Sequence, residues 1–298
     1  MNSRVEGSEK TGVLLQGDCL QLIPRLVKND RDRFDLIYVD PPFNAGGRRS
    51  ARVGRGERVR GAPAYRDAWG GLERFLDMLE PRLGAMRQVM SRRASLWLHL
   101  DYRAVHDAKV LADRVFGAAA FRGEIVWVPG NGARRSGGPS VTHQTILVYA
   151  PAEMIWNAGD PALREPYAEI SQKMHFRHVD SKGRRYRERS IAGKKYRYYA
   201  DTGRRIGSVW ADCPAMRANT PLVRETTGYP TQKPELLLER ILRAATSPGS
   251  RVLDPMCGSG TTLAVAARLG RRWAGIDESA LACGVVRRRL KLGLSPAG

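Results

Sequence analysis

The feature that most constrains the fold is a series of short apolar runs that each end at an aspartate. One of them, Phe34–Val39, is typical of a strand buried on both faces, and it stops at Asp40-Pro41-Pro42-Phe43, where two prolines force the chain to turn. The same pattern of an apolar run followed by an acid recurs at Asp18, Asp101, Asp254 and Asp277. Helical patterns alternate with the runs, which predicts a doubly wound α/β fold with a mostly parallel sheet.

Sheets of this kind bind ligands beyond the carboxyl ends of their strands. One acid after a strand is often a simple helix cap, whereas five along one edge indicate a ligand site. Further strands are expected at residues 124–128 and 144–149, and helices at 20–26, 71–90, 102–116, 234–245 and 261–269.

Two stretches depart from this alternation. Residues 44–67 are rich in Gly and Arg and lack an apolar period, so we expect a long loop, either ordinarily solvated or acting as a basic flap over a site. In residues 134–222 the apolar periodicity fades while Arg, Lys and Tyr alternate, as in Lys194–Tyr199. We therefore divide the chain into a first core segment at 1–133, an inserted basic region at 134–222 and a second core segment at 223–298.

The charge balance is strongly basic. Lys and Arg number 50 against 30 Asp and Glu, which gives a formal net charge of +20. Arginine suits phosphate because its planar fork offers several donors, but solubility or a coding bias would also explain the excess, so composition alone leaves nucleic-acid binding open. The candidate contacts in the inserted region are Arg134, Arg135, Arg184, Arg185, Lys194, Lys195 and Arg197.

Other classes find little support. The four cysteines form no Cys-x-x-Cys pair, so the sequence predicts neither a disulfide framework nor a metal site. No apolar run approaches the roughly 20 residues that span a bilayer, and the polar N-terminus does not resemble a signal peptide. We therefore expect a cytoplasmic protein without membrane contact.

A glycine-rich motif follows the strand that ends at Asp254, with the sequence VLDPMCGSGTT in residues 252–262. Its glycines let the backbone approach a ligand, and the helix expected from Thr261 offers free amide donors. Asp277 ends the next strand, where an acid suits the hydroxyls of a ribose. The spacing is neither that of a dinucleotide fingerprint nor that of a P-loop, and a tight turn without a ligand is the alternative.

The Asp-Pro-Pro-Phe motif suits a different chemistry. Its rigid turn aims a carboxylate, a carbonyl and an aromatic ring into one pocket. An exocyclic base amine is a poor nucleophile because its lone pair is conjugated into the ring. Hydrogen bonds to Asp40 and to the Pro41 carbonyl would localise that lone pair, while Phe43 would stack on the base. A structural turn with a core phenylalanine is the alternative.

At these residues the sequence resembles the β-class amino-methyltransferases of bacterial DNA, in which the catalytic motif precedes the recognition region and the cofactor motif comes last. The resemblance covers both core segments and departs from the family at Met256, where phenylalanine is common, and at residues 44–60, to which it does not extend. Its motifs stand in the family's order at Gly17-Asp18-Cys19, Asp40–Phe43, residues 95–101, residues 228–234, residues 254–262 and residues 275–277.

The resemblance implies a circularly permuted Rossmann-like fold with a seven-stranded type of sheet, and a role for each matched residue. Asp40, Pro41, Pro42 and Phe43 would form the target-base site, in a catalytic first half of the core. Residues 134–222 would recognise DNA, and residues 223–298 would bind S-adenosylmethionine. The implied cofactor contacts are Asp18 and Cys19 at its adenine, Asp277 at its ribose, Asp254, Pro255, Cys257, Gly258, Ser259, Gly260 and Thr261 at its methionine part, and Thr231 and Lys233 at its carboxylate.

The expected activity is methyl transfer to adenine N6 in duplex DNA, with the base flipped out of the helix. Cytosine N4 is the first alternative, and Asp40 favours adenine because cytosine enzymes of the family more often carry serine there. An RNA or protein-glutamine methyltransferase fits the motif order less well, and a DNA-binding protein without activity fits the intact motifs poorly. The resemblance also admits a homodimer and a cognate restriction endonuclease as partners.

Overall fold

The computed structural model describes residues 12–42, 48–51, 62–66, 70–130, 136–216 and 225–292, and gives the backbone alone at 48–51, 62–66 and 292. An eight-stranded sheet with the order β1-β15-β14-β2-β5-β7-β6-β13 lies at its centre. Neighbouring strands are parallel except where β7 pairs with β5 and β6. The expected doubly wound, mostly parallel sheet is thus confirmed. The strands are β1 (Gly12–Gln16), β2 (Phe34–Val39), β5 (Met90–Leu100), β6 (Phe121–Trp127), β7 (Gln144–Tyr149), β13 (Val209–Trp210), β14 (Arg251–Asp254) and β15 (Arg272–Asp277).

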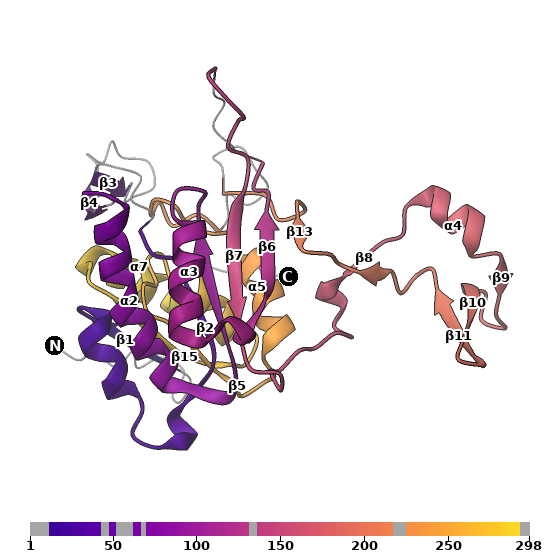
Figure 1. Ribbon diagram of the computed structural model, residues 1–298, viewed down its shortest axis with the longest axis horizontal. Helices are drawn as coiled ribbons and strands as arrows, with labels where there is room; N and C mark the ends of the chain where they lie inside the picture. The colour runs from indigo at the N-terminus through magenta and orange to yellow at the C-terminus, as the bar shows by residue number, and fades with distance from the viewer. Residues whose placement is uncertain are drawn as a thin grey trace.

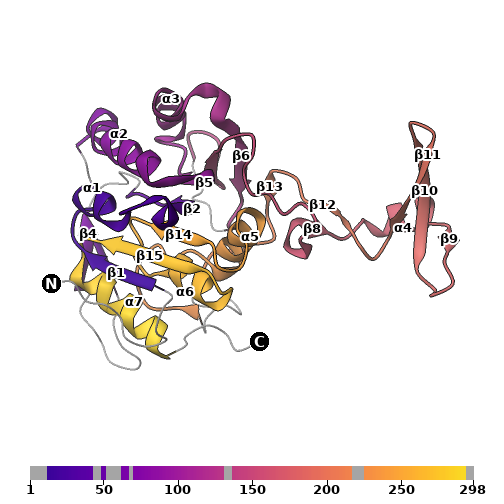
Figure 2. The ribbon, with the colours of Figure 1, turned by 90° about the horizontal axis from the view of Figure 1, so that it is seen from below.

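Helices cover both faces of the sheet (Figure 2). On β2, Ile37 packs into the apolar cluster of the first face, whereas its neighbour Leu36 packs into the cluster of the second. Because both faces are buried, the strand is apolar at every position except Asp35, as the sequence suggested. The helices are α1 (Cys19–Leu22), α2 (Leu72–Val89) and α3 (Val105–Phe116) on one face, and α5 (Glu235–Ala245), α6 (Thr261–Arg268) and α7 (Ala280–Leu292) on the other.

Two expectations need correction. The helix expected at residues 20–26 is one turn of α-helix followed by a 3₁₀ helix, because Pro24 lies within it. The stretch 44–67, expected to be a loop, contains an antiparallel pair of strands, β3 (Arg48–Ala51) and β4 (Ala62–Arg66). The 3₁₀ helices are η1 (Ile23–Leu26), η2 (Asp30–Asp32), η3 (Ala118–Ala120) and η4 (Pro161–Leu163).

A narrow arm projects from the β13 side of the core (Figure 1). Its neck is a two-stranded ladder in which Glu165 pairs with Arg204. Phe176, which is fully buried, packs on Tyr167 with ring centroids 4.6 Å apart and gives the arm a small core of its own. The elements of the arm are β8 (Arg164–Glu165), α4 (Glu169–His175), β9 (His178–Val179), β10 (Arg185–Ile191), β11 (Lys194–Tyr199) and β12 (Arg204–Arg205).

The arm is narrower than the inserted region expected at 134–222. Strand β7 lies within those bounds but belongs to the central sheet, between β5 and β6. Strand β13 likewise returns to the sheet and pairs with β6. The chain therefore leaves the core near β8 and comes back at β12.

Candidate functional site

Asp40 lies where β2 ends, and a lysine from a distant part of the chain holds it there. Its carboxylate forms an ion pair with Nζ of Lys233, 193 positions later in the sequence. The side chains of Asp40 and Lys233 are 19% and 8% exposed, so the pair is largely shielded from water. Neighbouring strand β14 pairs with β2 up to Leu253↔Ile37, which puts the end of β14 directly beside Asp40.

The glycine-rich turn connects β14 with α6 at this same edge. The backbone N–H of Gly258 donates to Oδ2 of Asp277 at 2.8 Å, so the acid that ends β15 fixes the turn. Gly260 has φ +73°, and a Cβ there would lie 2.7 Å from Cγ2 of Val286. Glycine is therefore required at position 260 by packing against α7, whatever the turn binds.

Lys233 connects the two turns. Its side chain pairs with Asp40, while its backbone carbonyl accepts a hydrogen bond of 3.1 Å from Oγ1 of Thr261. Tyr229, four residues earlier, lies against Gly258. The turns near residues 40 and 258 thus meet in one place. Thr231 lies in the same segment, exposed and with φ +57°. The expected contact of Lys233 and Thr231 with a cofactor carboxylate stays a prediction.

Asp18 and Cys19 follow β1 at the same edge of the sheet as Asp277, whose partner on β1 is Gln16. Asp18 caps α1 by accepting from the N–H of Leu20, and its Oδ1 also accepts from Nη2 of Arg82 at 2.8 Å. Cys19 is buried, and burial raises its thiol pKa to about 11. A neutral, buried thiol behaves as a small apolar residue, which is how Cys19 packs here. The same holds for Cys257, whose pKa burial raises well above the ordinary value.

The edge of the sheet is an acidic environment. Burial, together with the charges of Asp40 and Asp277, raises the pKa of Asp254 to about 7. Burial also raises the pKa of Asp277. Crowded, desolvated carboxylates favour a positively charged ligand, because a cation stabilises their ionised form. The acids that the sequence placed at this edge therefore share one electrostatic environment.

Sequence reasoning missed the support beneath the glycine-rich turn. Arg289 on α7 is 1% exposed, and its guanidinium donates to Oε1 of Glu235 at 2.6 Å and to Oγ1 of Thr261 at 3.1 Å. Arg289 stands in a run of three arginines, which reads as a solvated surface. The available signal was its helical spacing from Ala282 and Val286, both fully buried.

Of the basic residues expected to contact DNA, the arginines of the arm bond to other groups of the arm, whereas its two lysines lie exposed on the surface. Arg184 makes a two-pronged ion pair with Asp201, and Arg197 pairs with Glu188. Arg185 donates to the carbonyl of Phe176. Lys194 and Lys195 are exposed on β11. Arg134, Arg135 and Phe43 lie outside the described residues.

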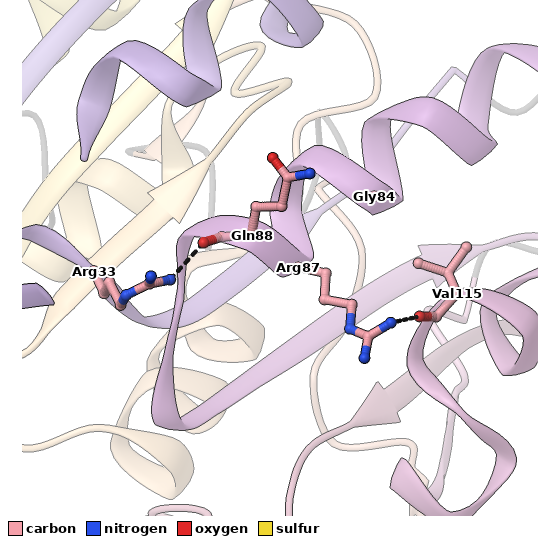
Figure 3. Close-up of a pocket in the computed structure, with 5 residues that line it drawn as sticks. All are labelled: Arg33, Gly84, Arg87, Gln88 and Val115. Carbon is pink, nitrogen blue, oxygen red and sulfur yellow. Dashed lines mark hydrogen bonds between the residues drawn. The ribbon is translucent and has the colours of Figure 1, made fainter. Parts of the chain in front are cut away.

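A surface hollow lies at the opposite edge of the sheet (Figure 3). Arg33 and Arg87 line it, and their guanidinium groups donate to the carbonyls of Gln88 and Val115. Arg33 precedes β2, whereas Asp40 follows it, so the hollow is separate from the candidate site. Within the described part of the chain, no cluster of His, Cys, Asp and Glu is suited to hold a metal, and no helix is long and apolar enough to cross a bilayer.

Comparison with known proteins gives the class of the chain. The model of a family described as DNA methylase matches residues 34–286. The chain therefore belongs to the N6/N4 DNA amino-methyltransferases.

Individual relatives agree with this class. The chain is 27% identical to the type II methyltransferase M.EcaI of Enterobacter cloacae over 88% of its length, and it spans 66% of that protein. It is also 27% identical to the DNA adenine methyltransferase YhdJ of Escherichia coli K12, covering 89% of this chain and 77% of the relative.

Solved structures share the fold at lower identity. The M1.HpyAVI–SAM complex aligns with a TM-score of 0.55 at 17% identity, over 94% of this chain and 98% of the other. The cytosine-N4-specific PvuII methyltransferase aligns with a TM-score of 0.56 at 14% identity, over 95% and 94% of the two chains.

Proposed function

We propose that this protein transfers a methyl group from S-adenosylmethionine to N6 of an adenine that is flipped out of duplex DNA. The observation that carries the proposal is the position of Asp40. Its carboxylate lies beside the glycine-rich turn and is held there by Lys233, whose backbone is bonded to Thr261 of that turn. A base bound at Asp40 and a cofactor bound at the turn would share one crevice.

The residues at the turn suit this cofactor. Bound S-adenosylmethionine supplies a sulfonium carbon as the methyl donor. Its positive charges match the edge lined by Asp254 and Asp277, where burial raises both pKa values. Its ribose would lie at Asp277 and its methionine part at residues 254–261. Asp18 and Cys19 would border its adenine.

The work of the protein in this reaction is to orient and polarise the amine. Lys233 holds Asp40 in place through their ion pair. The ionised carboxylate accepts a hydrogen bond from the amine and helps to localise its lone pair. Rate enhancement then comes from alignment of donor and acceptor and from fixed charges, without a covalent intermediate. Neither Cys19 nor Cys257 is needed as a nucleophile.

The choice of adenine rests on Asp40 in its motif and on the adenine relative YhdJ. The cytosine-N4 reaction is the alternative, and the PvuII enzyme shows that the same fold supports it. Nucleoside analysis of DNA from a methylation-deficient host that expresses this chain separates the two. We expect N6-methyladenine, whereas N4-methylcytosine alone would overturn the assignment of the base.

DNA would be bound by the arm together with the core edge. The arm carries the hairpin of β10 and β11 away from the sheet (Figure 1). Lys194 and Lys195 are exposed on this hairpin, which suits contact with the phosphates of a duplex. A second copy of the chain and a cognate restriction endonuclease are further partners that we propose from the resemblance and from the type II relative. Mass measurement in solution, alone and with DNA, tests for the homodimer.

The first prediction concerns Asp40. We expect Asp40→Ala to lose methyl transfer by about 1000-fold or more, because the amine loses its polarising acceptor. Binding of S-adenosylmethionine should survive, since Asp40 is not among the expected cofactor contacts. Transfer of a labelled methyl group to unmodified DNA measures the first effect, and calorimetric titration measures the second. Full activity in this variant would refute the role of Asp40.

A further inference from the structure

A buried ionic network lies beneath the cofactor turn and reaches the target-base site. Arg289 of α7 donates from Nη1 to Oγ1 of Thr261 at 3.1 Å and from Nη2 to Oε1 of Glu235 at 2.6 Å. The arginine and Glu235 are 1% and 3% exposed at their side chains, so the pair is screened from water. The network therefore belongs to the interior of the domain and not to its basic surface.

The hydroxyl of Thr261 connects this network to Lys233, on the other side of the glycine-rich turn. It accepts from Arg289 and donates to the backbone carbonyl of Lys233 at 3.1 Å. The ammonium of the same lysine pairs with Asp40. A continuous path of polar contacts thus runs from α7, through the first residue of α6, to the catalytic carboxylate.

Resting on the function proposed above, we infer that Arg289 is a positioning residue that keeps the cofactor turn and the target-base turn in a fixed relation. It touches neither substrate nor cofactor in this inference and acts through Thr261. Glu235 orients the guanidinium, and the N–H of Glu235 is itself held by Oε2 of Glu225 at 3.0 Å. The supporting groups come from α5, α6 and α7, so tertiary packing fixes the geometry.

The structure offers a matched control in Arg271. It is also buried, at 7% exposure, and donates to the hydroxyl and the carbonyl of Thr246 at 3.0 Å each. Arg271 precedes β15, at the end of that strand opposite Asp277. Arg271→Met removes a buried, hydrogen-bonded guanidinium as Arg289→Met does, without touching the cofactor turn.

The test compares the two variants of the full chain at a temperature where both are folded. For Arg289→Met we expect kcat to fall and KM for S-adenosylmethionine to rise, by about 10- to 100-fold in kcat/KM, because small displacements of reacting groups are costly. Arg271→Met should lower the melting temperature and leave both constants within about twofold of the parent, as at sites distant from the chemistry. Equal kinetic losses in both variants would overturn the inference.

A double-variant cycle tests whether Arg289 acts through the threonine. Thr261→Val removes the bridging hydroxyl with little change of shape, and Thr261→Ser retains it. We expect Thr261→Val to show the defect of Arg289→Met, Thr261→Ser to restore activity, and the double variant to be no worse than the worse single one. If the losses of activity in the two single variants multiply in the double variant, Arg289 does not act through Thr261, and the inference is contradicted. If Arg289→Met does not fold, Arg289→Lys replaces it in the double-variant cycle.

These outcomes are distinct from failure of the proposed function. If the parent chain neither binds S-adenosylmethionine nor methylates unmodified bacterial DNA, the proposed function fails. If the parent is active and the Arg289 and Arg271 variants behave alike, the proposed function stands and the positioning role fails.

Discussion

At the scale of single residues, Asp254 shows how the fold opposes ionisation of a carboxyl group at the site. It ends β14 with 3% exposure, and its Oδ1 accepts from the N–H of Met256 at 3.3 Å. Burial raises its pKa from 3.8 to about 7. In the absence of a cation, the folded chain thus holds, between about pH 4 and pH 7, a proton that the unfolded chain has lost.

This gives a pH-dependent prediction. Between pH 4 and pH 7 the unfolded state ionises Asp254 and the folded state does not, so this group lowers the free energy of unfolding as pH rises through that window, by about 2–4 kcal/mol. Asp254→Asn removes the contribution of this group to the pH dependence of the free energy of unfolding. We expect the variant to gain stability relative to the parent on going from pH 5 to pH 7.5, as measured by urea unfolding. A constant difference between the two chains would contradict it.

The residues of the site differ in how far the sequence could predict them. The aspartates were predictable because each follows an apolar run, and strand ends share one edge in a parallel sheet. The Lys233–Asp40 pair and the burial of Arg289 were not, because both depend on contacts between segments far apart in the chain. Arginine can be buried where its guanidinium finds a carboxylate, and a run of three arginines does not show which one does.

At the scale of elements, the hairpin of β10 and β11 has two unlike faces. On one face, Tyr186 lies opposite Tyr199, with ring centroids 5.8 Å apart. Glu188 lies opposite Arg197 on the same face and forms an ion pair with it. Tyr199 of β11 therefore packs against a ring of the neighbouring strand on this face. The other face presents Arg189 opposite Tyr196, which is 45% exposed. Acidic residues of the two strands are absent from this second face, which suits contact with phosphates.

The matching prediction compares one arginine from each face. Arg189→Ala should weaken DNA binding and reduce the dependence of log K on log salt by about 0.9, the change expected for one lost phosphate contact. Arg197→Ala lies on the same hairpin but removes a cation already paired with Glu188, so it should change the salt slope much less. Fluorescence anisotropy with a labelled duplex at several salt concentrations measures both. If Arg197→Ala reduces the salt slope more than Arg189→Ala does, the face that carries Glu188 and Arg197 is the one that contacts DNA.

At the scale of the whole molecule, the arm is joined to the core by a neck whose two strands, β8 and β12, pair with each other. Glu165 and Arg204 face each other across β8 and β12 and form an ion pair of 3.0 Å. On the core side of the neck, the N–H of Ile206 donates to the carbonyl of Leu163. The core therefore does not depend on the arm for its own packing.

We accordingly predict that residues 166–203 can be replaced by an Asn-Gly turn, which suits a two-residue connection between antiparallel strands. The shortened chain should keep its melting temperature within a few degrees and should still bind S-adenosylmethionine. Its affinity for duplex DNA should fall by at least about tenfold with the lost basic contacts. Retention of the parent's affinity would show that the core edge alone binds DNA.

The architecture was the part best predicted from sequence, since alternating strands and helices leave few topologies for a parallel sheet. The extent of the inserted region was predicted less well. Gln144–Tyr149 reads as a strand, yet its sequence does not show that it lies between β5 and β6 in the core sheet. The arm's form was also hidden, because its small core around Phe176 is too limited to give a clear period.

The pairing of Asp40 with a lysine 193 positions later has a consequence for biosynthesis. Asp40 is translated early, whereas Lys233 and the whole glycine-rich turn are translated long afterwards. A nascent or prematurely terminated chain thus carries the Asp-Pro-Pro sequence without the lysine that pairs with Asp40 in the folded protein. Under the proposed function, methylation of DNA therefore requires a chain that has been translated beyond the glycine-rich turn.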